Sequence, residues 1–123
     1  MLKLLLDEHI SKDVARGLRE RSRDIVVHAM AEWEGGNFLG QDDPVCLRAA
    51  AEQALTFVTY DGRTLPPLLK AWAEEERTHG GVLFVDEKTL PQADIGGLVK
   101  ALAGLHKETE KWDWTNRIVL LHR

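Results

Sequence analysis

The chain has 123 residues, of which 44% are hydrophobic and 29% are charged, and its formal net charge at pH 7 is −4. These values are typical of a single globular domain that buries most of its apolar surface without disulfide bonds. The acidic balance argues against a protein that coats nucleic acid non-specifically, because such proteins carry a positive surface. It still allows an enzyme with a small basic stripe for docking.

Cysteine usage and hydropathy indicate where the protein works. The only cysteine is Cys46, which excludes a disulfide framework and favours a reducing compartment. No apolar run is long enough to span a bilayer, and the first residues do not have the layout of a signal peptide. We therefore expect a cytoplasmic protein without a membrane partner.

The first part of the chain predicts two strands, with a helix between them and a loop after them. Residues 2–6 form an almost continuous apolar run, as expected of a strand buried on both faces. The helix that follows has Ser11 as its predicted N-cap. Residues 25–29 are rich in β-branched side chains and predict the second strand. Residues 30–41 contain three glycines and no clear periodicity, so we expect a loop there.

The middle of the chain predicts a helix, a strand and a further helix. Asp43 and Pro44 have the pattern of an N-cap followed by a proline in the first turn, and the helix extends to about Ala54. Residues 55–59 are the third predicted strand. The next helix has Thr64 as its expected cap, with apolar residues at helical spacing after it.

The last part predicts two strands with a helix between them. These elements are a strand at 82–85, a helix around 93–106 and a final strand at 117–121. Five strands joined by helical crossovers imply an α/β protein with a mainly parallel five-stranded sheet. We expect residues 1–123 to form one three-layer α/β/α domain, because the sequence contains no repeat, linker or low-complexity segment.

Acidic residues follow two of the predicted strands. Asp7 and Glu8 come directly after the first strand, and Asp61 comes one residue after the third. Ligands of open α/β sheets bind beyond the carboxyl ends of the strands, so these acids can converge there. Converging carboxylates without a fixed cation indicate a hard divalent metal or a shared proton. For one acid alone, a helix cap is the favoured interpretation.

Asp42 and Asp43 offer a third acid at the start of a helix. Because Asp43 has a structural role as the predicted cap, we expect Asp42 to face the sheet edge with Asp7 and Asp61. Three carboxylates, with water completing the shell, suit Mg²⁺ or Mn²⁺. The alternative is that both are loop acids near a helix N-terminus, where negative charge is favourable in any case.

Basic residues close to these acids are candidates for binding a phosphate. Lys12, Arg16, Arg19 and Arg23 share one face of the first predicted helix, where they can follow a phosphate backbone. The solvated side of an amphipathic helix is the favoured interpretation of that stripe. Arg63 follows the second strand-end acid by two residues, and it can bind a substrate phosphate or pair with an acid.

Several other chemistries have no support in the sequence. The five histidines and Cys46 do not have zinc-ligand spacing. There is no glycine-rich phosphate loop and no nucleophile elbow. Nucleotide cofactors and serine-hydrolase chemistry are therefore not expected.

The ordered acids resemble those of the PIN-like proteins, in particular the short prokaryotic branch related to VapC-type toxins. The resemblance rests on Leu4-Leu5-Leu6-Asp7-Glu8, on Asp42 three residues before Val45, and on Phe57-Val58-Thr59-Tyr60-Asp61. It extends to about residue 85, and the last third matches in layout only.

This resemblance implies a metal-dependent ribonuclease, a hydrolase of RNA phosphodiesters in which Asp7, Asp42 and Asp61 hold Mg²⁺ or Mn²⁺. The implied supporting or substrate-binding residues are Glu8, Asp43, Arg63, Lys12 and Arg16. The implied partners are RNA, a small antitoxin protein and a second copy of the chain.

Two alternative functions were also considered from the sequence: a PIN-like binding module and a signalling receiver domain. Arg63 stands where many PIN sequences have a further acid, which leaves open a binding or dimerisation module that keeps the fold without strong catalysis. A signalling receiver domain also has strand-end acids. We do not expect it here, because it also needs a lysine after its last strand and a closing helix.

Overall fold

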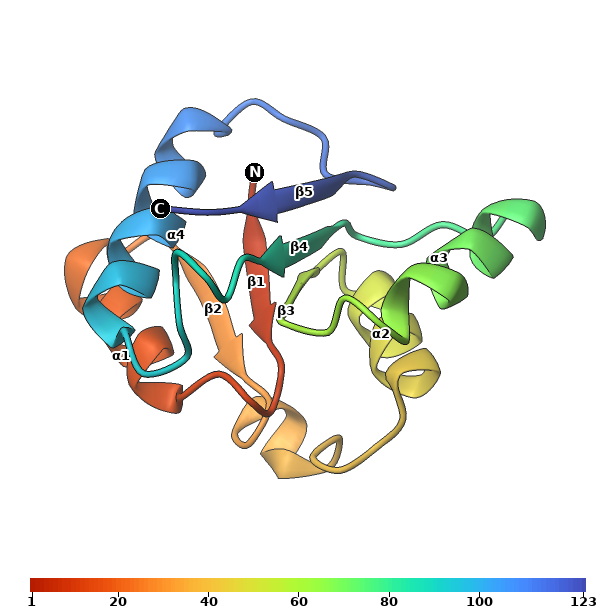
Figure 1. Ribbon diagram of the computed structural model, residues 1–123, viewed down its shortest axis with the longest axis horizontal. Coiled ribbons are helices and arrows are strands. Elements are labelled where there is room, and N and C mark those ends of the chain that lie inside the picture. Colours follow the sequence, from red (N-terminus) through yellow and green to blue (C-terminus); the bar gives the residue numbers. More distant parts are fainter.

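Short apolar runs alternate with amphipathic segments along the chain, and this alternation produces five strands and four α-helices (Figure 1). The computed structural model describes all residues, 1–123. The strands are β1 Lys3–Leu6, β2 Val26–Ala29, β3 Thr56–Thr59, β4 Val82–Val85 and β5 Ile118–Leu121. The helices are α1 Lys12–Arg21, α2 Asp43–Glu52, α3 Leu65–Glu74 and α4 Ile95–Glu108. No helix combines the length and the apolar character that a membrane crossing needs.

The five strands form one sheet in the order β2-β1-β3-β4-β5, and every neighbouring pair is parallel. The predicted α/β class and five-stranded sheet are therefore confirmed, and the sheet is parallel throughout. β1 and β3 are direct neighbours, with Leu6 opposite Val58. Because parallel strands end at the same edge of a sheet, the residues after β1 and β3 lie side by side.

Helices cover both faces of the sheet, which gives three layers. Alternate strand residues point to opposite faces, so each strand contributes to two cores. On one face Leu6 and Val58 pack in a cluster with residues of α1 and α4. On the other face Leu5 and Phe57 pack in a cluster with residues of α2 and α3. Burial on both faces explains why successive residues of these strands are apolar, as Leu4 to Leu6 and Phe57 to Val58 are.

The starts of the helices confirm one expectation from the sequence and correct two others. Ser11 caps α1 as predicted, because its hydroxyl oxygen accepts a hydrogen bond from the Asp13 amide at 3.1 Å. The predicted cap of α2 was wrong, since Asp42 occupies the N-cap position and Asp43 is already the first helical residue. Residues 30–41 were expected to be a loop, but they contain a short 3₁₀ helix, η1 Trp33–Gly36. Trp33 is buried against the sheet and fixes this turn.

Gly81, directly before β4, allows the backbone to lie close to the Trp114 carbonyl. Its φ of +101° lies in the region that favours glycine, and a Cβ there would lie 2.7 Å from the Trp114 carbonyl oxygen. The Gly81 carbonyl accepts a hydrogen bond from the Phe57 amide at 3.0 Å, which places β4 beside β3. A side chain at this position would therefore strain the sheet next to its central strand.

We predict that Gly81→Ala lowers the free energy of unfolding by more than about 1 kcal/mol, because it combines a positive φ with a backbone clash. Urea denaturation followed by circular dichroism measures the change. Gly96→Ala is the matched control, since a Cβ at Gly96 meets nothing within 4 Å and alanine favours the helix. Equal stability of Gly81→Ala and the wild type would contradict the prediction.

Candidate functional site

Asp7 lies directly after β1 and is only 7% exposed. Its Oδ1 accepts a hydrogen bond from the His9 amide at 2.8 Å, and its Oδ2 accepts one from the Thr59 hydroxyl. The Asp7 amide also donates to the Val58 carbonyl at 3.0 Å, which extends the pairing of β1 with β3 by one residue. Burial raises the pKa of Asp7, although both of these hydrogen bonds oppose the rise.

Asp61 lies next to Asp7 in the fold because β1 and β3 are neighbours, and the Thr59 hydroxyl connects the two acids. The Asp61 amide donates to the Thr59 Oγ1 at 3.0 Å, and the same hydroxyl donates to Asp7. The Asp61 carboxylate accepts from the amides of Arg63 at 2.9 Å and Thr64 at 3.0 Å, and from the Thr64 hydroxyl. Chiefly through the bonds from Thr64, these donors lower the pKa of Asp61 to about 2. Asp61 is therefore ionised and fixed in orientation.

Asp43 is the third acid that the structure brings to this edge. It is half-buried in the first turn of α2, and its Oδ2 lies 3.1 Å from the Thr64 hydroxyl that also bonds Asp61. Burial is the main cause that raises the pKa of Asp43, and the negative charges of Asp61 and Asp7 raise it further. Asp43 therefore senses the charges of both other carboxylates.

Asp42 and Asp43 have the opposite placement from the one expected from sequence. Asp42 is exposed, its side chain makes no capping hydrogen bond, and it does not line the cavity that contains the other acids. The reason is local, because Asp42 has extended backbone angles at the N-cap whereas Asp43 begins the helical turn. The acid that faces Asp7 and Asp61 is thus Asp43.

These acids line a cavity of about 300 Å³ at the carboxyl ends of β1 and β3. Its acidic lining residues are Asp7, Glu8, Asp43, Asp61 and Glu87. No lysine or arginine lines the cavity, and His9 is the one lining residue that can become cationic. The negative charge is therefore not balanced by the protein itself.

Two other ionisable residues of the cavity are unsuited to act as bases or nucleophiles. Burial, with the nearby acids, raises the pKa of Cys46 to about 11, so its sulfur stays a thiol. Burial also raises the pKa of Tyr60 to about 12, and its hydroxyl donates to the Leu90 carbonyl at 2.6 Å. The carboxylates remain the reactive groups of the cavity.

The structure separates the predicted basic residues from the acids. Lys12 and Arg16 are exposed on α1 and do not line the cavity, and Arg16 pairs with Asp13 at 2.5 Å. Arg63 is also exposed, and only its backbone amide bonds Asp61. Its guanidinium forms no ion pair, so it does not neutralise the neighbouring acid.

Sequence reasoning missed Thr59, Thr64 and Glu87. Thr59 is buried, whereas Thr64 is exposed at the start of α3 and was assigned only a capping role. A polar residue at the carboxyl end of a strand, two residues before the strand-end acid, was a usable signal for Thr59. Glu87 lies after β4, where the strand-end rule also applies but was not used.

The donor groups of the cavity are of the kind that binds a divalent cation. Oxygen donors in excess negative charge match the preference of Mg²⁺ and Mn²⁺. As the side chains lie, however, no three His, Cys, Asp or Glu residues form a cluster that could hold a metal ion. Asp7 and Asp61 are instead engaged with threonine hydroxyls. The donor chemistry fits the cation, and its binding would require these carboxylates to exchange their threonine contacts.

Comparisons with protein-family models, with curated proteins and with solved structures found no significant match. The functional inference therefore rests on the residues, the fold and the cavity.

We predict opposite stability effects for two isosteric substitutions. Burial of a charge raises the pKa of Asp7, so its ionised form destabilises the fold, and Asp7→Asn should increase the free energy of unfolding at pH 7. Hydrogen bonds lower the pKa of Asp61, so Asp61→Asn should decrease it, by about 1 kcal/mol after allowing for solvent screening.

The pH dependence separates the two effects when urea denaturation is repeated between pH 7 and acid. The gain from Asp7→Asn should shrink as the pH falls through the raised pKa of Asp7 towards 3.8, the ordinary value. The loss from Asp61→Asn should persist to lower pH and disappear only towards pH 2. Effects of the same sign at pH 7 would contradict the electrostatic description.

Proposed function

We propose that the protein is a PIN-like, metal-dependent endoribonuclease that hydrolyses RNA phosphodiesters with Mg²⁺ or Mn²⁺. The observation that carries this proposal is the cavity at the sheet edge. Asp7, Asp43 and Asp61 come from three different elements, and they line it without a lysine or arginine to balance their charge. Such an arrangement favours a hard cation over an organic anion, because the cation supplies the missing positive charge.

The order of the acids along the chain also supports the proposal. One acid follows β1, one begins α2 and one follows β3, as in the PIN-like resemblance, with Asp43 in place of Asp42. Five parallel strands covered by helices on both faces fit such a fold. An antitoxin partner and a prokaryotic source belong to the proposal through the resemblance alone, whereas the proposed cytoplasmic location rests on the single cysteine and the hydropathy of the sequence.

The chain's own residues have separate tasks in this proposal. Asp61 is ionised at all physiological pH values and is held by the Thr64 and Arg63 amides. Asp7 and Asp43 have raised pKa values, so loading of the cavity should release protons and weaken as the pH falls. When bound, the cation supplies a Lewis acid for a phosphoryl oxygen and lowers the pKa of a water molecule.

The substrate phosphate must approach from the open rim of the cavity. Arg63 does not line the cavity, but its amide bonds Asp61, its side chain is exposed and its guanidinium has no ion-pair partner, so it is available to a phosphate. Glu8 and Glu87 line the same cavity and can hold water through hydrogen bonds. In this proposal the acids of the cavity bind the cation, and the exposed Arg63 binds the phosphate.

A second candidate function is a PIN-like binding or dimerisation module without strong catalysis. The specific observations that favour it are Arg63, in the place of a further acid, and the absence of three ligands already grouped for a metal. Metal binding without RNA cleavage would support this second function over the first.

Metal binding should depend on Asp43 and not on its neighbour. We predict that Mn²⁺ raises the melting temperature of the wild type and of Asp42→Asn, but not of Asp43→Asn or Asp7→Asn. A hundredfold excess over Kd adds about 2.7 kcal/mol of stability by mass action. Differential scanning fluorimetry with and without Mn²⁺ measures the shift. An equal shift in Asp42→Asn and Asp43→Asn would contradict the assignment of the third acid.

RNA cleavage should require both the cation and the ionised acid. We predict that purified protein cleaves single-stranded or structured RNA with Mg²⁺ or Mn²⁺ and not with a chelator. Asp61→Asn should lower the rate by at least about a hundredfold, because it removes a charge that holds the cation. Asp42→Asn is the matched control with unchanged cleavage. Cleavage that survives in Asp61→Asn would point to a contaminating nuclease and contradict the mechanism.

A further inference from the structure

His9 is the one histidine that lines the acidic cavity at the ends of β1 and β3. The other histidines of the chain lie elsewhere in the fold. Cys46 also lines the cavity, but burial raises the pKa of its thiol to about 11, and a metal binds the thiolate. The donors that the cavity offers to a cation are therefore oxygens and the imidazole of His9.

A tight turn holds the backbone of His9 beside Asp7. The Asp7 carbonyl accepts a hydrogen bond from the Ile10 amide at 3.1 Å, and Ile10 is buried in the core. The His9 amide donates to the Asp7 Oδ1 at 2.8 Å. Glu8 and His9 therefore occupy the tip of an anchored turn between β1 and α1, and both line the cavity.

The ring of His9 has no partner within the chain. Its side chain is exposed, and it forms no hydrogen bond or ion pair with another residue. The carboxylates of Asp7, Asp43 and Asp61 differ, because each accepts from a threonine hydroxyl. His9 is therefore a donor that can turn towards a cation without giving up a contact of its own.

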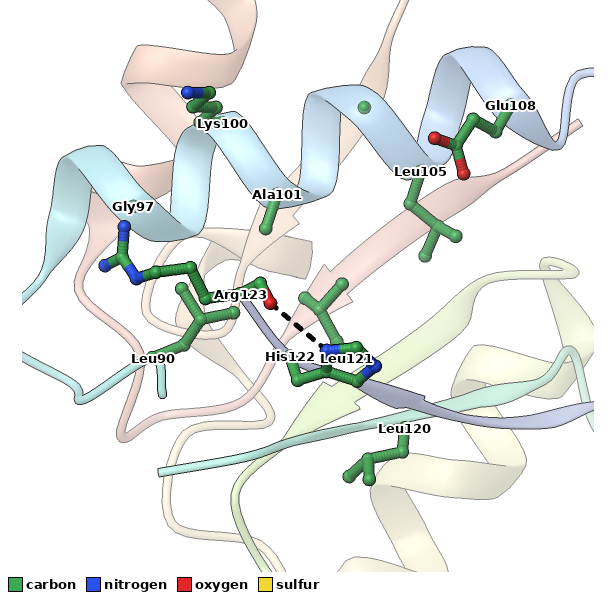
Figure 2. Close-up of a pocket in the computed structure, with 11 residues that line it drawn as sticks. Leu90, Gly97, Lys100, Ala101, Leu105, Glu108, Leu120, Leu121, His122 and Arg123 are labelled. Atoms are coloured by element: carbon green, nitrogen blue, oxygen red, sulfur yellow. Dashed lines mark hydrogen bonds between the residues drawn. The ribbon is translucent and has the colours of Figure 1, made fainter. Parts of the chain in front are cut away.

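His122 is also exposed, but its surroundings are different. It lines a groove of about 470 Å³ between α4 and the end of β5 (Figure 2). Lys100 and Arg123 line the same groove, and Glu108 is its one acidic residue. The His122 Nδ1 lies 3.2 Å from the main-chain oxygen of Arg123, as the dashed line in Figure 2 marks. Positive side chains oppose a metal ion there, so His122 provides a control for His9.

The kind of donor atom decides which cation a site prefers. Mg²⁺ is a hard cation that takes oxygen ligands and keeps several waters. First-row transition metals accept imidazole nitrogen, and their affinity for a mixed nitrogen and oxygen site rises from Mn²⁺ towards Co²⁺ and Ni²⁺. Carboxylates alone bind both classes of cation, whereas a histidine added to them favours the transition metals.

We propose that His9 is a nitrogen ligand of the cavity and makes it select a first-row transition-metal ion, such as Mn²⁺ or Co²⁺, over Mg²⁺. The inference rests on the proposed metal-dependent function and narrows the choice of its cation. Asp7 supplies an oxygen donor from the same turn, and the hydrogen bond from the His9 amide keeps the two residues together.

Calorimetric titration of the full chain with Mg²⁺, Mn²⁺ or Co²⁺ alone tests the preference. The wild type should bind Mn²⁺ at least about tenfold more tightly than Mg²⁺. His9→Gln replaces the nitrogen donor with an amide oxygen and keeps the backbone amide that bonds Asp7. This variant should raise the Kd about tenfold for Mn²⁺, more for Co²⁺ and less than about twofold for Mg²⁺.

His122→Gln is the matched control and should leave all three Kd values unchanged. A metal-free melting temperature of His9→Gln equal to that of the wild type shows that the fold is retained. An equal change of Kd for the three metals in His9→Gln would overturn the proposal, because such a change does not depend on nitrogen. Unchanged Kd values for Mn²⁺ and Co²⁺ in this variant would also overturn it.

Pulsed electron paramagnetic resonance of bound Mn²⁺ tests the ligand directly. Coupling of the Mn²⁺ electron spin to a nitrogen nucleus should appear in the wild type and change when the histidines carry the heavier nitrogen isotope. It should vanish in His9→Gln and persist in His122→Gln. Bound Mn²⁺ without nitrogen coupling would overturn the proposal, and the ring of His9 would then be free for the substrate phosphate.

These measurements separate the role of His9 from the metal-dependent function itself. Binding of Mg²⁺ and Mn²⁺ with similar Kd values and without nitrogen coupling would remove the role of His9 and leave the metal-dependent function. Absence of binding for all three metals would overturn both.

Discussion

The site depends on a single hydroxyl, that of Thr59, which joins the ends of two neighbouring strands. It donates to the Asp7 carboxylate and accepts from the Asp61 amide, so one side chain fixes both acids. This link exists only because β1 and β3 are adjacent and parallel, with Leu6 opposite Val58. The apolar side chains of both strands, buried on both faces of the sheet, hold that register. The core of the sheet and the geometry of the cavity are thus determined together.

Burial and hydrogen bonding act on neighbouring acids in opposite directions. Asp7 is buried, and the loss of water raises its pKa, whereas Asp61 accepts several hydrogen bonds that lower its pKa to about 2. The pKa of Asp43 is raised as well, mainly by burial and further by the charge of Asp61. Asp61 therefore stays ionised to a lower pH than the other two acids, and a cation would stabilise the ionised forms of Asp7 and Asp43 most. This division suits the proposed metal-dependent chemistry, and the burial of Asp7 reduces the stability of the fold at neutral pH.

The hydrophobic pattern predicted the fold well, because burial on both faces leaves a strong signal in the sequence. It also indicated where Asp7 and Asp61 lie, since Asp7 directly follows one predicted strand and Asp61 comes one residue after another. The choice between Asp42 and Asp43 was wrong because a one-residue shift of a helix start leaves almost no trace in the sequence, yet it turns a side chain from solvent into the cavity. Thr59 and Glu87 were missed because their roles depend on contacts with residues far away in the chain. The exposure of Ile118 and Leu120 was equally hidden, since an edge strand and a central strand can have the same apolar sequence.

The central claim is that Asp7, Asp43 and Asp61 form one electrostatic unit at the sheet edge. The most direct measurement is an NMR titration of their carboxyl carbons, with and without Mg²⁺. The account predicts that Asp7 and Asp43 titrate above the ordinary value of 3.8 and Asp61 below it, at about 2, and that Mg²⁺ lowers the pKa values of Asp7 and Asp43. Ordinary pKa values for all three carboxyls, unchanged by Mg²⁺, would contradict it.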